Sequence, residues 1–390
     1  MSEYRTTLSD LYRMKTYRSQ YLSSMFGDNV SITLVAKVGT TVSQRQLHVA
    51  TRPPGRPTMR DVAALAGVAV KTVSRVFNDV PTVDPELADR VRSAANKLGY
   101  RPNLTASSLR RGDRRTGTIG LLLDNVANPF SGILQRAVED VARDAGVQVL
   151  TGSLDIDPAR EKLLARILID RGVDGLIIMP VASDHAYLAV EQQAGTPMVF
   201  VDREPSLVGG DVVLTANREG AISGVAHLLH AGHRRIGYLG DSQRISTARD
   251  RFAGYTEALH AAGLQPDRRL VRHDLGTAEA AEVATGELLD AAPVPTALFT
   301  SKNVITIGAI RALRTRQLHT RVALVGFDDF MIADLLQPAI TVVSQDPAEM
   351  GTRAARVLFE RINGDDHGPL RQILPTVLIP RGSGEIAPSD

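Results

Sequence analysis

The 390-residue sequence contains no cysteine and no tryptophan, and only 4% of its residues are aromatic. Without cysteine the chain can form no disulfide framework, no thiolate metal site and no thiolate nucleophile, which suits a reducing cytosol. No apolar run approaches the roughly 18 residues that a membrane span needs, and the opening MSEYRTTLSDLYRMKTYRSQ lacks the apolar core of a signal peptide. We therefore expect a cytoplasmic protein without contact to a membrane.

Motifs that carry catalysis or bind a nucleotide cofactor are missing as well. No G-x-G-x-x-G follows the first expected strand, and there is no Walker loop, no H-E-x-x-H and no G-x-S-x-G. His227, His230 and His233 recur at three-residue spacing, but Gly232 interrupts the helix and no carboxylate lies at ligand spacing. A helix C-terminus that favours histidine explains them better than a metal does. The sequence therefore predicts no catalytic residue, no metal and no cofactor.

The net charge of +2 conceals an asymmetry along the chain. Residues 52–115 carry 13 Lys and Arg against 6 Asp and Glu, and residues 1–51 carry 6 against 3. The remainder, 116–390, therefore has a net charge of −8. A basic head precedes an acidic body: the head is a candidate polyanion binder, and the body should be repelled by nucleic acid.

From residue 118 onward, short apolar runs alternate with amphipathic segments. Runs such as TIGLLLD (118–124) and VALVGFDD (322–329) are typical of buried strands, and ILQRAVEDVARDAG (133–146) has the apolar spacing of a helix. Strands that alternate with helices predict parallel sheets covered by helices. About nine strands exceed the average sheet, so two subdomains are expected.

Polar residues follow many of these runs, at the strand ends where such sheets bind ligands. They either cap the following helices or line a cleft for a polar small molecule, and the cleft is the preferred interpretation. The residues concerned are Asp124, Asn125, Asp202, Arg203, Asp241, Ser242, Ser301, Lys302, Asn303, Asp328, Asp329, Gln345 and Asp346.

Residues 58–112 show helical patterns only. Thr58 begins the first helix with a capping box, Gly67 allows a turn, a short helix follows over 70–78, and a third spans 84–99. Two short helices joined by a glycine-containing turn form a helix-turn-helix, whose second helix enters the DNA major groove. A solvated basic face would explain one such helix alone, but the adjoining helix and the positive charge favour DNA. The outward residues suited to base edges or phosphates are Lys71, Thr72, Arg75 and Asn78.

The segment YRPNLTASSLRRGDRRTG (100–117) follows this head. Asn103 would cap a helix of barely two turns, which is too short to be stable alone and should fold only when a partner orders it. Leu109, flanked by Ala106 and two arginines, suggests an apolar wedge for the DNA minor groove. A flexible basic linker is an equally good interpretation.

These residues carry a resemblance to a known family. TMRDVAALAGVAVKTVSRVFN (58–78) and LADRVRSAANKLGYRPNLTASSLRRG (87–112) resemble the DNA-binding head and hinge of the LacI/GalR family of bacterial transcription regulators. The similarity continues in HLLHAGHRRIGYLG (227–240) and VGFDD (325–329), and it covers roughly 58–381. The resemblance implies a dimer on a pseudo-palindromic operator, hinge helices that insert a leucine pair into the minor groove, and a periplasmic-binding-protein-like core whose cleft takes a small effector, often a sugar.

Transferred residue by residue, the resemblance implies two sets of contacts. Those to DNA are Thr58, Val70, Lys71, Thr72, Arg75, Asn78, Asn103, Ala106 and Leu109. Those to the effector are Phe130, Asp202, Thr247, Arg251, Asp274, Asn303, Asp328 and Gln345. Arg251, Asp202 and Asp328 could each form paired hydrogen bonds to sugar hydroxyls, and Phe130 would supply the stacking ring.

The sequence departs from the family pattern at two places near the cleft. Ala216-Asn217 stands where the family usually has Asp-Asn, and Lys302-Asn303 stands where it usually has Asn-Asp. Losing a carboxylate and adding an ammonium could favour an anionic effector, such as a phosphorylated or acidic sugar. The alternative, which we prefer from the sequence alone, is that Lys302 points to solvent.

The predicted fold class is an N-terminal all-α helix-turn-helix head plus an α/β periplasmic-binding-protein-like core of two doubly wound parallel-sheet subdomains. Residues 1–51 have no counterpart in the family pattern, and we expect a disordered extension or a misassigned start. The further predicted divisions are a head at 58–102, a hinge helix and linker at 103–117, a core at 118–381 with crossovers near 215, 343 and 373, and a tail at 382–390.

The predicted function is that of a sequence-specific transcriptional regulator, and a repressor is preferred. Its partners would be operator DNA, a small sugar-like effector and a second copy of the chain, and DNA binding would place it with the nucleoid. Leucine heptads for a tetramerising helix are missing at the C-terminus PRGSGEIAPSD, so a homodimer is expected. A sugar-binding transport component and an α/β enzyme with an accessory DNA domain are the alternatives; the missing signal peptide and catalytic motifs argue against them.

Overall fold

The computed structural model describes residues 57–77, 80–101 and 115–388. The expected extension 1–51, Asn78 and the candidate hinge residues Asn103, Ala106 and Leu109 lie outside the described residues. In the described part of the chain, no helix is both long and apolar enough to cross a membrane.

The head contains three helices: α2 (Met59–Ala66), α3 (Val70–Phe77) and α4 (Pro85–Leu98). Local signals set their ends, as the sequence predicts. The Thr58 amide and hydroxyl each donate to Asp61 Oδ2 at 2.7 Å, and Asp84 accepts from the Leu87 amide at 3.1 Å. Gly67 ends α2 with a φ of 65°, a conformation that glycine adopts without strain. A small core holds the three helices together: Val62, Ala63, Ala66, Val73, Val76, Ala88, Val91, Ala94 and Ala95.

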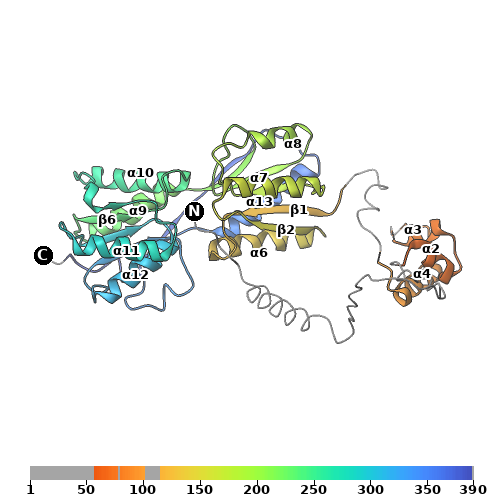
Figure 1. Ribbon diagram of the computed structural model, residues 1–390, viewed down its shortest axis with the longest axis horizontal. Coiled ribbons are helices and arrows are strands. Elements are labelled where there is room, and N and C mark those ends of the chain that lie inside the picture. Colours follow the sequence, from red (N-terminus) through yellow and green to blue (C-terminus); the bar gives the residue numbers. More distant parts are fainter. Residues whose placement is uncertain (1–56, 78–79, 102–114, 389–390) are drawn as a thin grey trace, which may run out of the picture.

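The first sheet of the core is wholly parallel, in the order β11-β5-β4-β3-β1-β2. Helices cover both of its faces (Figure 1), with α6 and α13 packed in one hydrophobic cluster and α7 in the other. Its strands are β1 (Thr118–Leu123), β2 (Gln148–Ser153), β3 (Leu176–Ile178), β4 (Met198–Val201), β5 (Asp211–Thr215) and β11 (Arg371–Leu374). Its helices are α6 (Pro129–Asp144), α7 (Pro158–Asp170), α8 (Ala189–Gln193) and α13 (Pro347–Ile362).

The second sheet has the order β12-β10-β9-β8-β6-β7 and is parallel except for β12, which runs antiparallel to β10. Here α9 and α10 cover one face and α11 and α12 the other. Its strands are β6 (Ile236–Leu239), β7 (Val271–Arg272), β8 (Ala297–Thr300), β9 (Ala323–Phe327), β10 (Thr341–Ser344) and β12 (Val377–Ile379). Its helices are α9 (Asn217–His230), α10 (Ser246–Ala261), α11 (Ala278–Asp290) and α12 (Asn303–Thr315).

The chain passes from one sheet to the other three times. The passages lie between β5 and α9, between β10 and α13, and between β11 and β12. Each sheet with its helices forms one subdomain, and the two stand side by side (Figure 1). The carboxyl ends of the parallel strands meet between the subdomains, which is where doubly wound sheets bind ligands.

Three glycines allow pairs of helices to lie in close contact. A Cβ on Gly254 of α10 would lie 2.3 Å from the Arg218 carbonyl oxygen of α9. A Cβ on Gly308 of α12 would lie 2.2 Å from the Ala278 carbonyl oxygen of α11. A Cβ on Gly351 of α13 would lie 2.5 Å from the Leu134 carbonyl oxygen of α6. Backbone atoms cannot yield as the end of a side chain can, so each of these helix pairs requires glycine at the contact.

We expect Gly254→Ala to destabilise the core by about 1–3 kcal/mol, because α9 and α10 must separate to admit the methyl group. Thermal unfolding of the purified chain measures this, and a drop of several degrees is expected. Gly209→Ala in the loop before β5 is the control, since a Cβ there meets nothing within 4 Å. Equal melting temperatures for the two variants would contradict the proposed close contact.

Candidate DNA-binding and effector-binding sites

The outward face of α3 is basic. Val73 and Val76 are buried against α2 and α4, whereas Lys71 and Arg75 are exposed. Within the described residues neither Lys71 nor Arg75 forms an ion pair, so both side chains are available to an anionic partner. Val70 is 43% exposed beside them, an apolar contact of the kind that suits a thymine methyl group.

Two further predicted DNA contacts, Thr72 and Thr58, differ in exposure. Thr72 is half-buried on α3, and Thr58 is exposed, with its hydroxyl used in the cap of α2. The hydrogen bond from the Thr58 amide, and to a smaller extent that from its hydroxyl, lowers the pKa of the Asp61 carboxyl. The cap therefore carries a negative charge at neutral pH.

Six of the eight predicted effector residues border one cavity between the subdomains: Phe130, Asp202, Thr247, Arg251, Asp328 and Gln345. We call this the inner cavity. Its volume is about 40 Å³, which leaves room for only a few water molecules in this conformation. An effector of sugar size therefore requires the two subdomains to move apart or side chains to withdraw.

The other two predicted residues lie beside the inner cavity rather than on its wall. Asp274 borders a neighbouring, larger cavity. Asn303 is 2% exposed, and its side-chain nitrogen donates to Asn128 Oδ1 at 2.9 Å. Because Asn128 precedes α6 and Asn303 begins α12, this hydrogen bond joins the two subdomains.

Three of the predicted residues hold a left-handed backbone conformation. The φ angles are 65° for Asp202, 62° for Asp274 and 73° for Asp328. A non-glycine residue at such an angle is strained, and strained residues collect at ligand sites because the surrounding structure must hold them there. The turns that follow β4 and β9 thus place two carboxylates at the inner cavity.

Arg251 is the most tightly held cation of the site. It is 5% exposed, its Nε donates to Asn217 Oδ1 at 2.7 Å, and its Nη1 donates to the Ser301 carbonyl at 2.6 Å. Its Nη1 also lies 3.8 Å from Asp328 Oδ2, and its guanidinium carbon lies 3.8 Å from the centre of the Phe327 ring. Burial and these partners fix one orientation of the guanidinium at the cavity wall.

Arg203 and Lys302 form a second ionic group, which the list of effector residues missed. Arg203 Nη2 donates to Asp124 Oδ2 at 3.1 Å, and its Nε lies 3.2 Å from Asp202 Oδ2 without hydrogen-bond geometry. Lys302 Nζ lies 3.1 Å from Asp241 Oδ2 and 4.0 Å from Asp124 Oδ2. Burial is the largest influence on Asp202 and raises its pKa, in spite of Arg203 and Arg251 nearby.

The interpretation that Lys302 points to solvent is wrong. Its side chain is only 16% exposed and borders the inner cavity. The physical reason is the strand order: β6 lies beside β8, so Asp241 and Lys302 follow neighbouring strand ends, and Asp124 approaches from the other sheet. An ammonium turned to water would leave the partly buried Asp241 carboxylate without its partner.

Two buried acceptors at this cavity have no hydrogen-bond partner in the described structure. They are Asp124 Oδ1 and Gln345 Oε1, whose residues both border the inner cavity. Buried polar atoms are normally satisfied, so unsatisfied ones at a cavity wall indicate a ligand or water that donates hydrogen bonds. Hydroxyl groups are such donors. The position of Asp124 directly after β1 was the signal in the sequence that could have placed it among the effector residues.

The three histidines of α9 and the turn after it do not converge. His227 pairs with Glu385, whereas His233 contacts Thr296 Oγ1 at 2.9 Å and the Ile386 carbonyl at 2.8 Å. Both rings tie the C-terminal segment to the second subdomain, which is a structural role.

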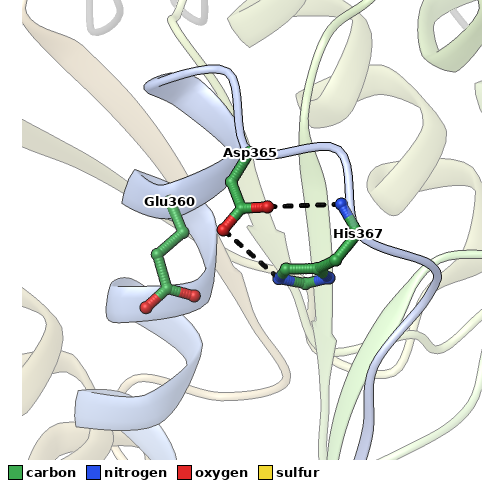
Figure 2. Close-up of side chains that lie close together, drawn as sticks. All are labelled: Glu360, Asp365 and His367. Atoms are coloured by element: carbon green, nitrogen blue, oxygen red, sulfur yellow. Dashed lines mark hydrogen bonds and ion pairs between the residues drawn. The ribbon is translucent and has the colours of Figure 1, made fainter.

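One other group in the described part of the chain could approach a metal. Glu360 in the last turn of α13, with Asp365 and His367 in the turn after it, places ligand atoms within 4.8 Å of one another (Figure 2). His367 Nδ1 contacts the Gly368 carbonyl at 2.9 Å, and its Nε2 lies 3.9 Å from Asp365 Oδ2. Both carboxylates are exposed, and the contacts within the turn hold Asp365 and His367 together without an ion.

Comparison with known proteins agrees with this architecture. The model of the bacterial regulatory proteins of the lacI family matches residues 58–103, and that of the periplasmic binding protein-like domain matches residues 225–384. The chain is 35% identical to the HTH-type transcriptional regulator CelR of Thermobifida fusca over 340 residues, which are 84% of this chain and 98% of that protein.

Two solved structures are similar over the same extent. The complex of the transcriptional regulator CelR with cellobiose is 33% identical and superposes with a TM-score of 0.62, covering 84% of this chain and 100% of that one. The lac repressor dimer bound to operator and the anti-inducer ONPF is 27% identical, with a TM-score of 0.74 over 85% of this chain and 99% of that one. The protein is thus a regulator of transcription rather than an enzyme, and it belongs to the lacI family of bacterial regulatory proteins.

Proposed function

We propose that the protein is a repressor that binds operator DNA through α3 and releases it when a sugar or sugar derivative enters the inner cavity. One observation carries the proposal: the same chain has a basic, exposed helix face on α3 and a buried polar cavity between two subdomains. The relative that was solved with cellobiose and the one solved on its operator support the two halves of this proposal.

The chemistry of the inner cavity favours a polyhydroxylated effector. Asp124 Oδ1 and Gln345 Oε1 can accept from hydroxyls, and Arg251 can donate to them. The positive charge that Lys302 adds is balanced by Asp241 and Asp124, so it gives the inner cavity no free cation. Phe130 is the aromatic side chain at the wall and would pack against a sugar ring.

Control would follow from the contacts that join the subdomains. An effector in the inner cavity must disturb the Asn128–Asn303 hydrogen bond or the approach of Lys302 to Asp124. The residues just before β1 are fixed to the first subdomain, because the Thr116 and Gly117 amides donate to the Asp174 carboxylate at 2.6 and 2.8 Å. A change in subdomain angle would therefore move the segment that leads to the head. The coupling is reciprocal, so operator DNA weakens binding of an inducer by the same factor.

Fluorescence anisotropy tests this function. The full chain is titrated onto DNA from its own promoter region, with random DNA as competitor, across a salt series. We expect specific binding that weakens steeply with salt, because phosphate contacts release counterions. Equal, weak binding to both DNAs, also after addition of sugars and sugar phosphates, would reject a sequence-specific repressor.

We further propose that the repressor acts as a homodimer in the cytoplasm, since a palindromic operator calls for a two-fold axis. An apolar surface on the core suits a second copy of the chain. Met331 is 85% exposed and Ile133 48%, and both border a groove of about 760 Å³ together with Pro129 and Phe330. Leu335, four residues after Met331, is 75% exposed. Exposed apolar residues that gather at a groove mark interaction sites.

Replacing Met331 and Leu335 by aspartate should convert the dimer to a monomer, because each carboxylate would have to be desolvated at the interface. Light scattering after size-exclusion chromatography measures the mass. Val190→Asp on α8 is the control, because Val190 is 70% exposed in another part of the core. A double variant that remains dimeric would place the interface elsewhere.

A further inference from the structure

A second cavity adjoins the inner one and is far larger. This outer chamber has a volume of about 580 Å³, a size typical of ligand sites, and residues of both subdomains border it. Arg203, Asp241 and Ile245 border both cavities, so a ligand in the inner cavity can extend into the outer chamber. The predicted effector residue Asp274 borders the outer chamber only.

Half of the charged groups around the outer chamber are already paired. Glu204 accepts from Arg371 Nε at 2.7 Å, Asp241 pairs with Lys302 at 3.1 Å, and Arg203 pairs with Asp124 at 3.1 Å. The remaining charged groups on the wall are Arg244, Arg249 and Asp274. All three are exposed, and none forms an ion pair with another described residue. The unpaired charge of the chamber is therefore positive, with two cations against one carboxylate.

The local structure fixes one of these arginines and the loop that carries the other. Arg249 Nη1 donates to the Gln243 carbonyl at 3.0 Å and to the Arg244 carbonyl at 2.9 Å. The loop before α10 is thereby fastened to the first turn of the helix. A guanidinium that is held in place loses little freedom when it binds a second group through its other N–H donors.

Two further features of this wall favour an anion. Helix α10 begins after Ile245, which has no side-chain oxygen to cap the helix, and Ile245 and Ser246 at this helix start border the chamber. Ser242 and Ser246 add hydroxyl donors to the same wall.

We propose that the effector carries an anionic group, a phosphate or a carboxylate, which binds Arg244 and Arg249 in the outer chamber while its hydroxyls occupy the inner cavity. The proposal rests on the proposed function, because it names the effector class of the same site. It also moves the anion away from Lys302, whose charge Asp241 and Asp124 already balance. Arginine suits this role, since its planar fork matches the oxygens of both anions.

The first test uses inorganic phosphate as the smallest probe. Titration calorimetry at low ionic strength should show phosphate binding to the full chain and at least roughly tenfold weaker binding to Arg244→Gln/Arg249→Gln. Arg268→Gln/Arg314→Gln is the matched control: both arginines are exposed in the same subdomain and border neither cavity, and this variant should bind phosphate like the unaltered chain. Absence of phosphate binding, or equal binding by the first double variant, overturns the proposal.

The second test compares glucose, glucose 6-phosphate and glucuronate, which separates phosphate from carboxylate. A charged sugar should bind at least about tenfold more tightly than glucose, and Arg244→Gln/Arg249→Gln should abolish that advantage. Glucose that binds as tightly as both charged sugars overturns the proposal, and if no sugar binds, the phosphate titration decides. Operator binding is measured on the same samples. Specific operator binding without anion binding rejects this inference alone, whereas loss of specific operator binding rejects the repressor itself.

Discussion

Replacing Lys71 and Arg75 together by alanine should weaken operator binding by about 100-fold, since each well-placed contact to DNA contributes roughly 1–3 kcal/mol. Both side chains are exposed on α3 and lack internal ion pairs in the described structure, so their removal leaves the head intact. The core of the head lies on the opposite face, around Val73 and Val76. Anisotropy on operator DNA measures the loss, and circular dichroism checks that the helices persist.

The salt dependence of each single variant separates the two kinds of contact. A side chain bound to phosphate should lower the salt slope by about one when it is removed, with equal loss on every sequence. A side chain bound to a base edge should instead relax specificity at one position of the operator. Lys97→Ala, an exposed lysine on α4, serves as control for the loss of one positive charge. Full operator affinity in the double variant would remove α3 as the recognition helix.

The head could be predicted closely because its signals are local. The capping box of Thr58 with Asp61, the left-handed Gly67 and the cap by Asp84 each act within four residues of the chain. Such contacts depend on sequence spacing alone. The parallel sheets were predictable for a related reason: alternation of strand and helix restricts the topology before any side-chain contact is known.

The position of the cleft could be predicted from the sequence, but the ion pairs inside it could not. The rule that ligands bind at the carboxyl ends of strands placed Asp124, Asp241 and Lys302 together. Which cation meets which carboxylate depends on strand order, because β6 and β8 are neighbours although 57 residues separate Leu239 from Ala297. No spacing in the sequence reports this. The same holds for the Asn128–Asn303 hydrogen bond and for the glycines at helix contacts, which join segments far apart in the chain.

Arg251→Ala should abolish the response to effector and also destabilise the core, so its two effects have to be measured separately. The substitution leaves Asn217 Oδ1 and the Ser301 carbonyl without their donor and removes the cation nearest to Asp328. We expect a loss of about 2–5 kcal/mol in the free energy of unfolding, which thermal unfolding reports. At a temperature where the core stays folded, operator binding should be retained, because the head folds around its own core.

Arg251→Lys distinguishes a binding role from a purely structural one. Lysine keeps the charge near Asp328, but its single ammonium cannot reproduce the planar donors that reach Asn217 and Ser301 together. We therefore expect a smaller loss of stability than for alanine, with effector-induced release of the operator still impaired by about tenfold or more. If Arg251→Lys regains stability and the full effector response together, Arg251 only supports the fold. If stability returns without the response, the guanidinium itself binds the effector, and the inner cavity is where the regulatory signal begins.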